Sequence, residues 1–120
     1  MDSHKGLFLM TDCIFCKIIA KQIPADVVYE DDKILVFKDI HPKARIHLLM
    51  ITKEHINNLA SFKTEHSEQM LHMLFMLPKL AKDQGLINGF RTVINTGIEG
   101  GQVVDHVHFH LLGGSTLPKM

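Results

Sequence analysis

Hydrophobic and polar residues alternate over residues 105–112, DHVHFHLL, and this alternation predicts a β-strand. Side chains along a strand point in turn to opposite faces. The imidazoles of His106, His108 and His110 are therefore expected on one face, while the other face is expected to be apolar. Imidazole titrates near neutral pH and can act as an acid, a base, a nucleophile or a metal ligand, so the histidine face is a candidate for chemistry.

Other apolar stretches predict four more strands, one short helix and one helical turn. The strands are expected over residues 27–30, 34–38, 46–52 and 90–95, the short helix over 14–21, and the helical turn over 57–61. An acidic turn between the first two strands resembles a hairpin connection.

The longest helix is predicted over residues 64–84. Its apolar face is formed by residues at helical spacing, namely Met70, Leu74, Leu77 and Ala81. Thr64 is expected to be the N-cap, and Gly85 is expected to end the helix in the left-handed conformation. Pro78 has no backbone N–H, so it is expected to kink or interrupt the second half. One long helix and five strands with short connections predict an α+β fold with a largely antiparallel sheet.

A single domain is expected over residues 11–120, after a disordered extension over 1–10 that is too short to span a membrane. The 120 residues are 46% hydrophobic and have a formal net charge of zero. Without a basic excess, nucleic acid polymers are not expected as partners, whereas a single nucleotide is compatible. No export signal is recognised, so we expect a cytoplasmic protein whose two cysteines, Cys13 and Cys16, are metal ligands or free thiols.

A glycine-rich loop directly precedes the histidine strand. Asn95 is followed by Gly97, Gly100 and Gly101. Glycines let backbone N–H groups approach an anion closely, so the loop is a candidate phosphate cradle. Paired glycines also occur in ordinary hairpin loops, and this alternative stays open.

Residues 95–114 follow the pattern N-x-G-x-x-G-G-Q-x-x-x-H-x-H-x-H-L-L-G-G. Together with CIFCKII at 13–19, FKDI-x-P at 37–42 and HLLMITKEHI at 47–56, this segment resembles the histidine-triad proteins, and among them the nucleotide-binding (Hint) branch. The resemblance covers nearly all of residues 13–114. It implies a homodimer whose two five-stranded sheets join into one, with pockets for a purine nucleotide such as an AMP or GMP derivative.

The resemblance also implies an activity. Members of this branch hydrolyse purine nucleoside phosphoramidates, such as AMP joined to an amine, and some accept aminoacyl-adenylates. His108 matches the nucleophile, whose neutral ring would attack the α-phosphorus and form a nucleotidyl-histidine that water then hydrolyses. His110 and His47 match neighbours that contact the phosphate, move protons or assist the leaving group.

Nucleotide-binding positions are implied in the same way. The base would lie between apolar side chains, those of Ile14, Phe15, Ile18, Phe37 and Ile40. Packing in the core explains these apolar residues about as well. Asp39 would bind the ribose hydroxyls. The phosphate would be lined by Asn95, Gly101 and the backbone N–H of Val103, beside His108 and His110.

The chain departs from the family pattern at two places. Val103 stands where many relatives have Ser, which removes a hydroxyl donor near the phosphate and is expected to lower activity. The last six residues, STLPKM, lack the Trp-Pro-Pro-Gly tail of several relatives, so the leaving-group preference of those relatives does not transfer.

Cys13-x-x-Cys16 supplies two thiolates that can share one zinc ion, which is half of a tetrahedral site. In relatives with this pair, histidines at the positions of His55 and His106 complete the site. A structural zinc is therefore expected, and the alternative is a pair of reduced thiols without a metal. No organic cofactor is expected.

Two further functions stay open at this point. Three aligned histidines can hold a catalytic metal, which would make the protein a metal-dependent hydrolase. The protein can also be a nucleotide-binding or scaffolding protein with little chemistry, a reading that Val103 favours.

Overall fold

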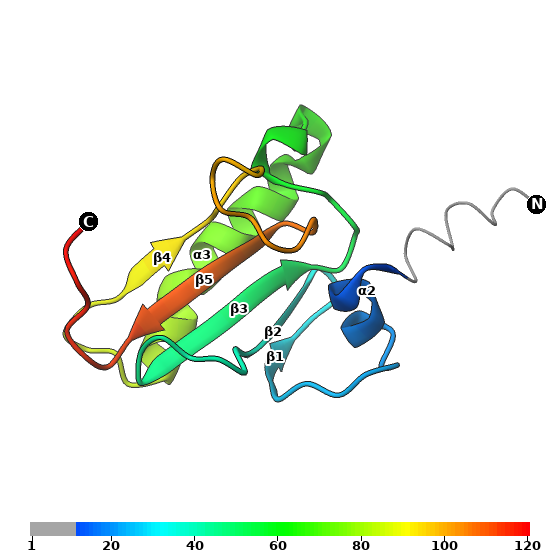
Figure 1. Ribbon diagram of the computed structural model, residues 1–120. Coiled ribbons are helices and arrows are strands. Elements are labelled where there is room, and N and C mark those ends of the chain that lie inside the picture. The colour runs from blue at the N-terminus through cyan, green and yellow to red at the C-terminus, as the bar shows by residue number, and fades with distance from the viewer. Residues whose placement is uncertain (1–11) are drawn as a thin grey trace, which may run out of the picture.

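The computed structural model describes residues 12–120, and these form a five-stranded sheet with a long helix across one face (Figure 1). The extension expected over residues 1–10 lies outside the described residues. All strand pairs are antiparallel, in the spatial order β1-β2-β3-β5-β4. The strands are β1 (Val27–Glu30), β2 (Ile34–Lys38), β3 (Ile46–Thr52), β4 (Arg91–Val93) and β5 (His108–Gly113). The expected α+β fold is confirmed.

Strands β1, β2 and β3 have the predicted bounds, whereas β4 is shorter than the predicted 90–95 and β5 begins only at His108. The start of the histidine strand was predicted wrongly, because the backbone N–H groups of residues 106 and 107 bond to loop carbonyls and not to a neighbouring strand. His106 N–H donates to the Val104 carbonyl at 2.8 Å, and Val107 N–H donates to the Ile56 carbonyl at 2.7 Å. His106 therefore lies in a bend before the strand.

The long helix α3 (Ser67–Asp83) follows a short 3₁₀ helix, η2 (Thr64–His66). Thr64 is not its N-cap, because the residue before α3 is His66 and the Thr64 carbonyl instead accepts the Ser67 hydroxyl at 2.6 Å. Gly85 ends the helix with φ of +78°, as predicted. The N–H of the next residue, Leu86, returns to the Ala81 carbonyl at 2.9 Å, as in a Schellman-type C-cap.

Pro78 does not interrupt α3, which runs through it to Asp83. A proline removes the bond to the carbonyl four residues earlier, here that of Leu74. Leu74 and Pro78 both lie on the exposed side of the helix, where water can bond that carbonyl. The same exposure corrects the predicted apolar face, since Leu74 is 47% exposed. The buried residues of α3 are Met73, Met76, Leu77, Leu80 and Ala81.

The short helix α2 (Ile14–Ile19) lies on the sheet face opposite α3 and ends before the predicted residue 21. Its N-cap is Cys13, whose sulfur accepts the Cys16 N–H at 3.3 Å. Lys21, with φ of +63°, turns the chain away after the helix. A third short element, the 3₁₀ helix η1 (Leu59–Ser61), lies within the predicted helical turn.

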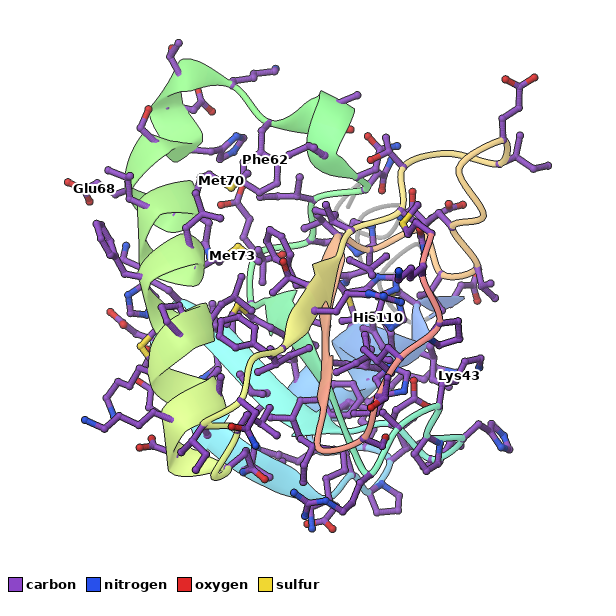
Figure 2. The ribbon with its side chains drawn as sticks, turned by 90° about the vertical axis from the view of Figure 1, so that its left-hand side faces the viewer. Lys43, Phe62, Glu68, Met70, Met73 and His110 are labelled. Atoms are coloured by element: carbon purple, nitrogen blue, oxygen red, sulfur yellow. The ribbon has the colours of Figure 1, made fainter. Side chains whose placement is uncertain are left out.

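Strand alternation divides the core into two clusters. The cluster under α3 contains Ile34, Val36, Leu48, Met50, Met73, Met76, Leu77, Leu80, Ala81, Leu86, Phe109 and Leu111. The cluster under α2 contains Phe15, Ile18, Leu35, Phe37, Leu49 and Ile51. His108 and His110 alternate with Phe109 and Leu111 along β5, so both imidazoles lie on the α2 side. Figure 2 shows Met73 pointing from α3 toward the sheet, and His110 on the opposite side of β5 with Lys43.

Within residues 12–120, no helix combines the length and the apolar character that a membrane crossing requires.

Candidate active site

The backbone selects one tautomer of the neutral His108 ring. His108 begins β5, is buried, and its Nδ1 lies 2.7 Å from the backbone carbonyl oxygen of His106. A carbonyl oxygen only accepts hydrogen bonds, so Nδ1 carries the proton and Nε2 of the neutral ring keeps its lone pair. The Phe15 ring packs edge-on against the imidazole, with 5.1 Å between centroids. The unprotonated Nε2 is the state that a nucleophile requires.

His47 and His110 form a hydrogen-bonded pair beside His108. The backbone N–H of Lys43 donates to His47 Nδ1 at 3.1 Å, which places the proton of neutral His47 on Nε2. That Nε2–H lies 3.0 Å from His110 Nδ1 and donates to it. The proton of neutral His110 is therefore on its Nε2. Because the His108 and His110 rings are 5.1 Å apart, this chain presents an N–H donor next to the His108 ring.

Burial keeps the pair neutral at physiological pH. It lowers the pKa of His110 from the ordinary 6.5 to about 4, and the neighbouring His108 and His47 act in the same direction. Burial likewise lowers the pKa of His47, against the attraction of Asp39, whose carboxylate lies 3.4 Å from His47 Nε2. A neutral pair acts as a hydrogen-bond donor toward an anion and holds no spare proton to transfer.

A second cluster lies where α2, the loop after β3 and the bend before β5 meet. The sulfur and Nδ1 atoms of Cys13, Cys16, His55 and His106 all lie within 4.8 Å of one another. Cys13 Sγ is 3.3 Å from His106 Nδ1, and Cys16 Sγ is 3.1 Å from His55 Nδ1 and 3.7 Å from His106 Nδ1. Sulfur and nitrogen ligands on one tetrahedral zinc ion lie about 3.5 Å apart, so the four atoms fit that metal.

Hydrogen bonds behind the cluster prepare both histidines as ligands. His106 Nε2–H donates to the Thr52 carbonyl at 2.7 Å, and His55 Nε2–H donates to Asn57 Oδ1 at 2.9 Å. Each ring therefore turns an unprotonated Nδ1 toward the sulfurs, which is the second-shell arrangement that metal-binding histidines use. Burial raises the pKa of the Cys16 thiol to about 12, so this thiol needs a bound cation to ionise.

The three triad histidines do not converge on one point. The ring of His106 belongs to the cysteine cluster, while His108 and His110 face the other site, so a catalytic metal held by all three is not supported. Asp39, His47 and His110 also bring ligand atoms within 4.8 Å of one another. His47 Nε2 carries a proton in the chain from Lys43, however, and a protonated nitrogen does not bind a metal.

The residues predicted around the base divide into buried and exposed ones. Phe15, Ile18 and Phe37 are buried in the core under α2, and the Phe15 and Phe37 rings meet edge to face at 5.7 Å. Ile14 and Ile40 are 49% and 85% exposed. Packing alone therefore accounts for the buried three, while Ile14 and Ile40 present apolar surface to solvent.

The residues predicted around the ribose and phosphate lie in loops. Asp39 is half-buried, and its Oδ1 accepts the His41 N–H at 2.8 Å. Asn95 is half-buried, Gly101 is exposed with φ of +82°, and Val103 is 92% exposed. Gly100 admits no side chain, because a Cβ there would lie 2.3 Å from the Thr96 carbonyl oxygen.

Sequence reasoning missed three residues that act through an amide side chain or the backbone, namely Gln102, Lys43 and Thr52. Gln102 holds the glycine loop closed by accepting the Gly97 N–H at 2.9 Å and donating to the carbonyls of Asn57 and Val104. The one sequence signal that could have identified Gln102 is its place at the end of the N-x-G-x-x-G-G-Q pattern. The Lys43 N–H and the Thr52 carbonyl carry no side-chain signal, so only the fold identifies them.

Known proteins resemble this chain over nearly all of its length. A family model described as "Scavenger mRNA decapping enzyme C-term binding" matches residues 12–119. The chain is 51% identical over 104 residues to Protein HitA of Neisseria gonorrhoeae, covering 87% of this chain and 97% of that protein. It is 48% identical over 103 residues to a 14 kDa zinc-binding protein of Zea mays, covering 84% and 80% of the two chains.

Two solved structures share the fold closely. A HIT family hydrolase from Legionella pneumophila Philadelphia 1 has a TM-score of 0.86 at 46% identity, covering 88% of this chain and 96% of that chain. A histidine triad nucleotide-binding protein from Candida albicans has a TM-score of 0.76 at 35% identity, covering 90% and 84%.

Proposed function

The chain belongs to the histidine-triad family, and from that premise we propose that it hydrolyses purine nucleoside phosphoramidates, with aminoacyl-adenylates as further substrates. The observation that carries the proposal is the hydrogen bond from His108 Nδ1–H to the His106 carbonyl, which leaves Nε2 free to attack phosphorus. The names of similar proteins, a hydrolase and a nucleotide-binding protein, support the reaction class and the ligand class.

The reaction has two displacements. In the first, the Nε2 lone pair of His108 attacks the α-phosphorus, the P–N bond breaks, and the amine leaves after taking one proton from solvent. In the second, water attacks the nucleotidyl-histidine, releases the nucleoside monophosphate and a proton, and returns neutral His108. The His110 Nε2–H, oriented by His47, donates to a non-bridging phosphate oxygen and stabilises the charge that builds up on it in both steps.

The nucleotide lies across the exposed edge of the α2 side. Ile14 and Ile40 cover the base on the rim of the buried Phe15 and Phe37 rings, and Asp39 accepts the ribose hydroxyls. Asp39 Oδ1 accepts the His41 N–H, so Oδ2, which lies 3.4 Å from His47 Nε2, is the oxygen that we assign to the ribose hydroxyls. The phosphate is lined by Asn95, Gly101 and the N–H of Val103.

Zinc bound by Cys13, Cys16, His55 and His106 stabilises the attachment of the N-terminal segment to the sheet. The second-shell bonds to Thr52 and Asn57 and the spacing of the four ligand atoms support this assignment. Zinc supplies charge that keeps both cysteines as thiolates. The cytoplasmic location that we propose would keep both thiols reduced and available to the metal.

A homodimer covers the exposed apolar surface of α3 and the short edge strand β4. Leu71, Leu74 and Phe75 on the outer face of α3 are 54%, 47% and 74% exposed, and Phe90 before β4 is 43% exposed. Pairing of two β4 edges would continue the sheet across the dimer. In sedimentation velocity, Phe75→Glu should give monomers. Ile98→Glu, at a 92% exposed loop position outside this surface, should leave the dimer intact.

Turnover of an adenosine phosphoramidate tests the activity. We expect release of AMP and free amine by the wild-type protein and loss of turnover in His108→Ala, with AMP affinity retained. His72→Ala is a control on the opposite side of the sheet, where His72 contacts Asp31 at 2.7 Å. Turnover by His108→Ala equal to that of the wild type would eliminate the covalent mechanism. No turnover by either protein would favour a nucleotide-binding role without chemistry.

A further inference from the structure

His106 belongs to both sites on the α2 side of the sheet. Its Nδ1 lies 3.3 Å from Cys13 Sγ and 3.7 Å from Cys16 Sγ, within the metal cluster. Its backbone carbonyl oxygen accepts the Nδ1–H of His108 at 2.7 Å. The hydrogen bond that fixes the protonation of the nucleophile therefore ends on a residue whose side chain is a metal ligand.

The strand ladder does not hold this carbonyl in place. His106 precedes β5, and the pairing of β3 with β5 starts only at Ile51 and His108. The backbone around His106 is tied by a tight turn to Val104 and by the bond from Val107 N–H to Ile56. The ring is the stronger anchor, because it is fully buried between the Thr52 carbonyl and the cysteines. The position of the carbonyl thus depends on where the ring is fixed.

Phe15 forms a second connection between the two sites. It lies between the two cysteines in the sequence and packs its ring edge against His106 at 5.8 Å and His108 at 5.1 Å between centroids. Fixing both cysteines therefore fixes the side chain that limits the tilt of the His108 ring. His55 closes the cluster from the far side, with its ring 4.7 Å from that of His106.

We infer that the four-residue metal cluster is a positioning device for the nucleophile. With Cys13, Cys16 and His55 drawn onto one ion together with His106, the His106 carbonyl is held where it binds His108 Nδ1–H. Without the ion, the His106 ring keeps its hydrogen bonds to Thr52 and the thiols and its packing on Phe15 and His55, but it loses the coordination bond that fixes its position relative to Cys13, Cys16 and His55. The role of His108 as nucleophile in this inference rests on the proposed function.

The test uses nitrogen NMR of the histidine side chains, which reports the ring nitrogen that carries the proton. Spectra are recorded without substrate on wild-type protein with zinc, on wild-type protein after chelation, and on three variants. His55→Asn removes one ligand, and His55→Cys replaces it with a thiolate that zinc also accepts. His72→Asn is the matched control, because His72, like His55, is a half-buried histidine, and its side chain bonds Asp31 away from the metal cluster. Comparison with His108→Gln assigns the His108 signals.

We expect a single Nδ1–H form of His108 in zinc-loaded wild type, His55→Cys and His72→Asn. Chelated wild type and His55→Asn should show a mixture, with the ratio of the two forms shifted on the order of fivefold, the factor of one weakened hydrogen bond. The kcat for a phosphoramidate should fall by about the same factor in His55→Asn and recover in His55→Cys.

Three results would overturn the inference. One is an unchanged His108 signal in protein shown by elemental analysis to have lost its metal. Another is an equal change in His55→Cys at full zinc content. The third is simultaneous loss of the native His72 signal, which would mean that the metal supports the whole fold and not the nucleophile in particular. Because the NMR measurement needs no substrate, a failure of the proposed activity leaves its outcome readable.

Discussion

The hydrogen-bond chain through His47 predicts different activities for two similar variants, His47→Gln and His47→Asn. The amide of Gln can place its nitrogen near the position of the His47 Nε2, so His47→Gln keeps a donor for His110 Nδ1. The shorter Asn places its amide near Nδ1, so His47→Asn can accept the Lys43 N–H but leaves His110 without its donor. Both variants lose the imidazole, but only His47→Asn removes the hydrogen bond that keeps the His110 proton on Nε2.

The magnitude follows from the 3.0 Å bond between His47 and His110. A hydrogen bond of this kind contributes about 1 kcal/mol, which corresponds to about a fivefold preference for the His110 form with its proton on Nε2. His110 is half-buried beside buried His47, so leaving its Nδ1 unpaired also costs about 1–3 kcal/mol of folding stability. We expect His47→Gln to keep about fivefold more kcat than His47→Asn, and to unfold at higher urea concentration.

The assay is steady-state hydrolysis of an adenosine phosphoramidate, with kcat and KM determined separately for both variants. His41→Gln serves as a control, because the His41 side chain is exposed and the substitution leaves its backbone N–H bond to Asp39 in place. Equal kcat values for His47→Gln and His47→Asn, or a higher value for His47→Asn, would refute the proton assignment along this chain.

Three other predictions concern stability, the phosphate loop and the metal. Burial lowers the pKa of His110 from 6.5 to about 4, so between these values the unfolded chain binds a proton that the folded protein does not. Stability should therefore fall as the pH decreases from 7 to 4.5, by about 2 kcal/mol from this residue, and urea unfolding of His110→Asn should lack that part of the loss. Val103→Ser restores a hydroxyl near the phosphate and should raise kcat/KM. Because position 103 is 92% exposed and water competes there, the gain should be about fivefold, with Val103→Ala showing none. Protein purified without added zinc should hold about one ion per chain, and Cys16→Ser far less; a metal content near zero in the wild type would contradict the assignment of the cluster.

The sheet could be predicted from the sequence because its strands carry clear local signals. The bounds of β1, β2 and β3 agree because each is an apolar run closed by turn residues. The helix end at Gly85 was also predicted correctly, because the left-handed conformation that ends a helix is a local preference of glycine.

The sequence could not predict features that depend on the tertiary arrangement. His106 has the same alternation as His108 and His110, and its departure from the strand comes from bonds to Val104 and Ile56. Leu74 fits the predicted helix face, but the rotation of α3 on the sheet buries Met73 and Met76 instead. Family resemblance supplied the candidate residues, whereas the protonation of His47 and His108 follows from backbone groups that the fold brings to them, and that of His110 from its hydrogen bond with His47.

The most direct test of the central claim is to mix the protein with excess adenosine phosphoramidate, quench within one turnover, and sequence the modified peptide by mass spectrometry. The account predicts an AMP adduct on His108 that decays as free AMP appears, and no adduct in His108→Ala. Steady turnover with no adduct on His108 at any time, or an adduct on His110 alone, would contradict it.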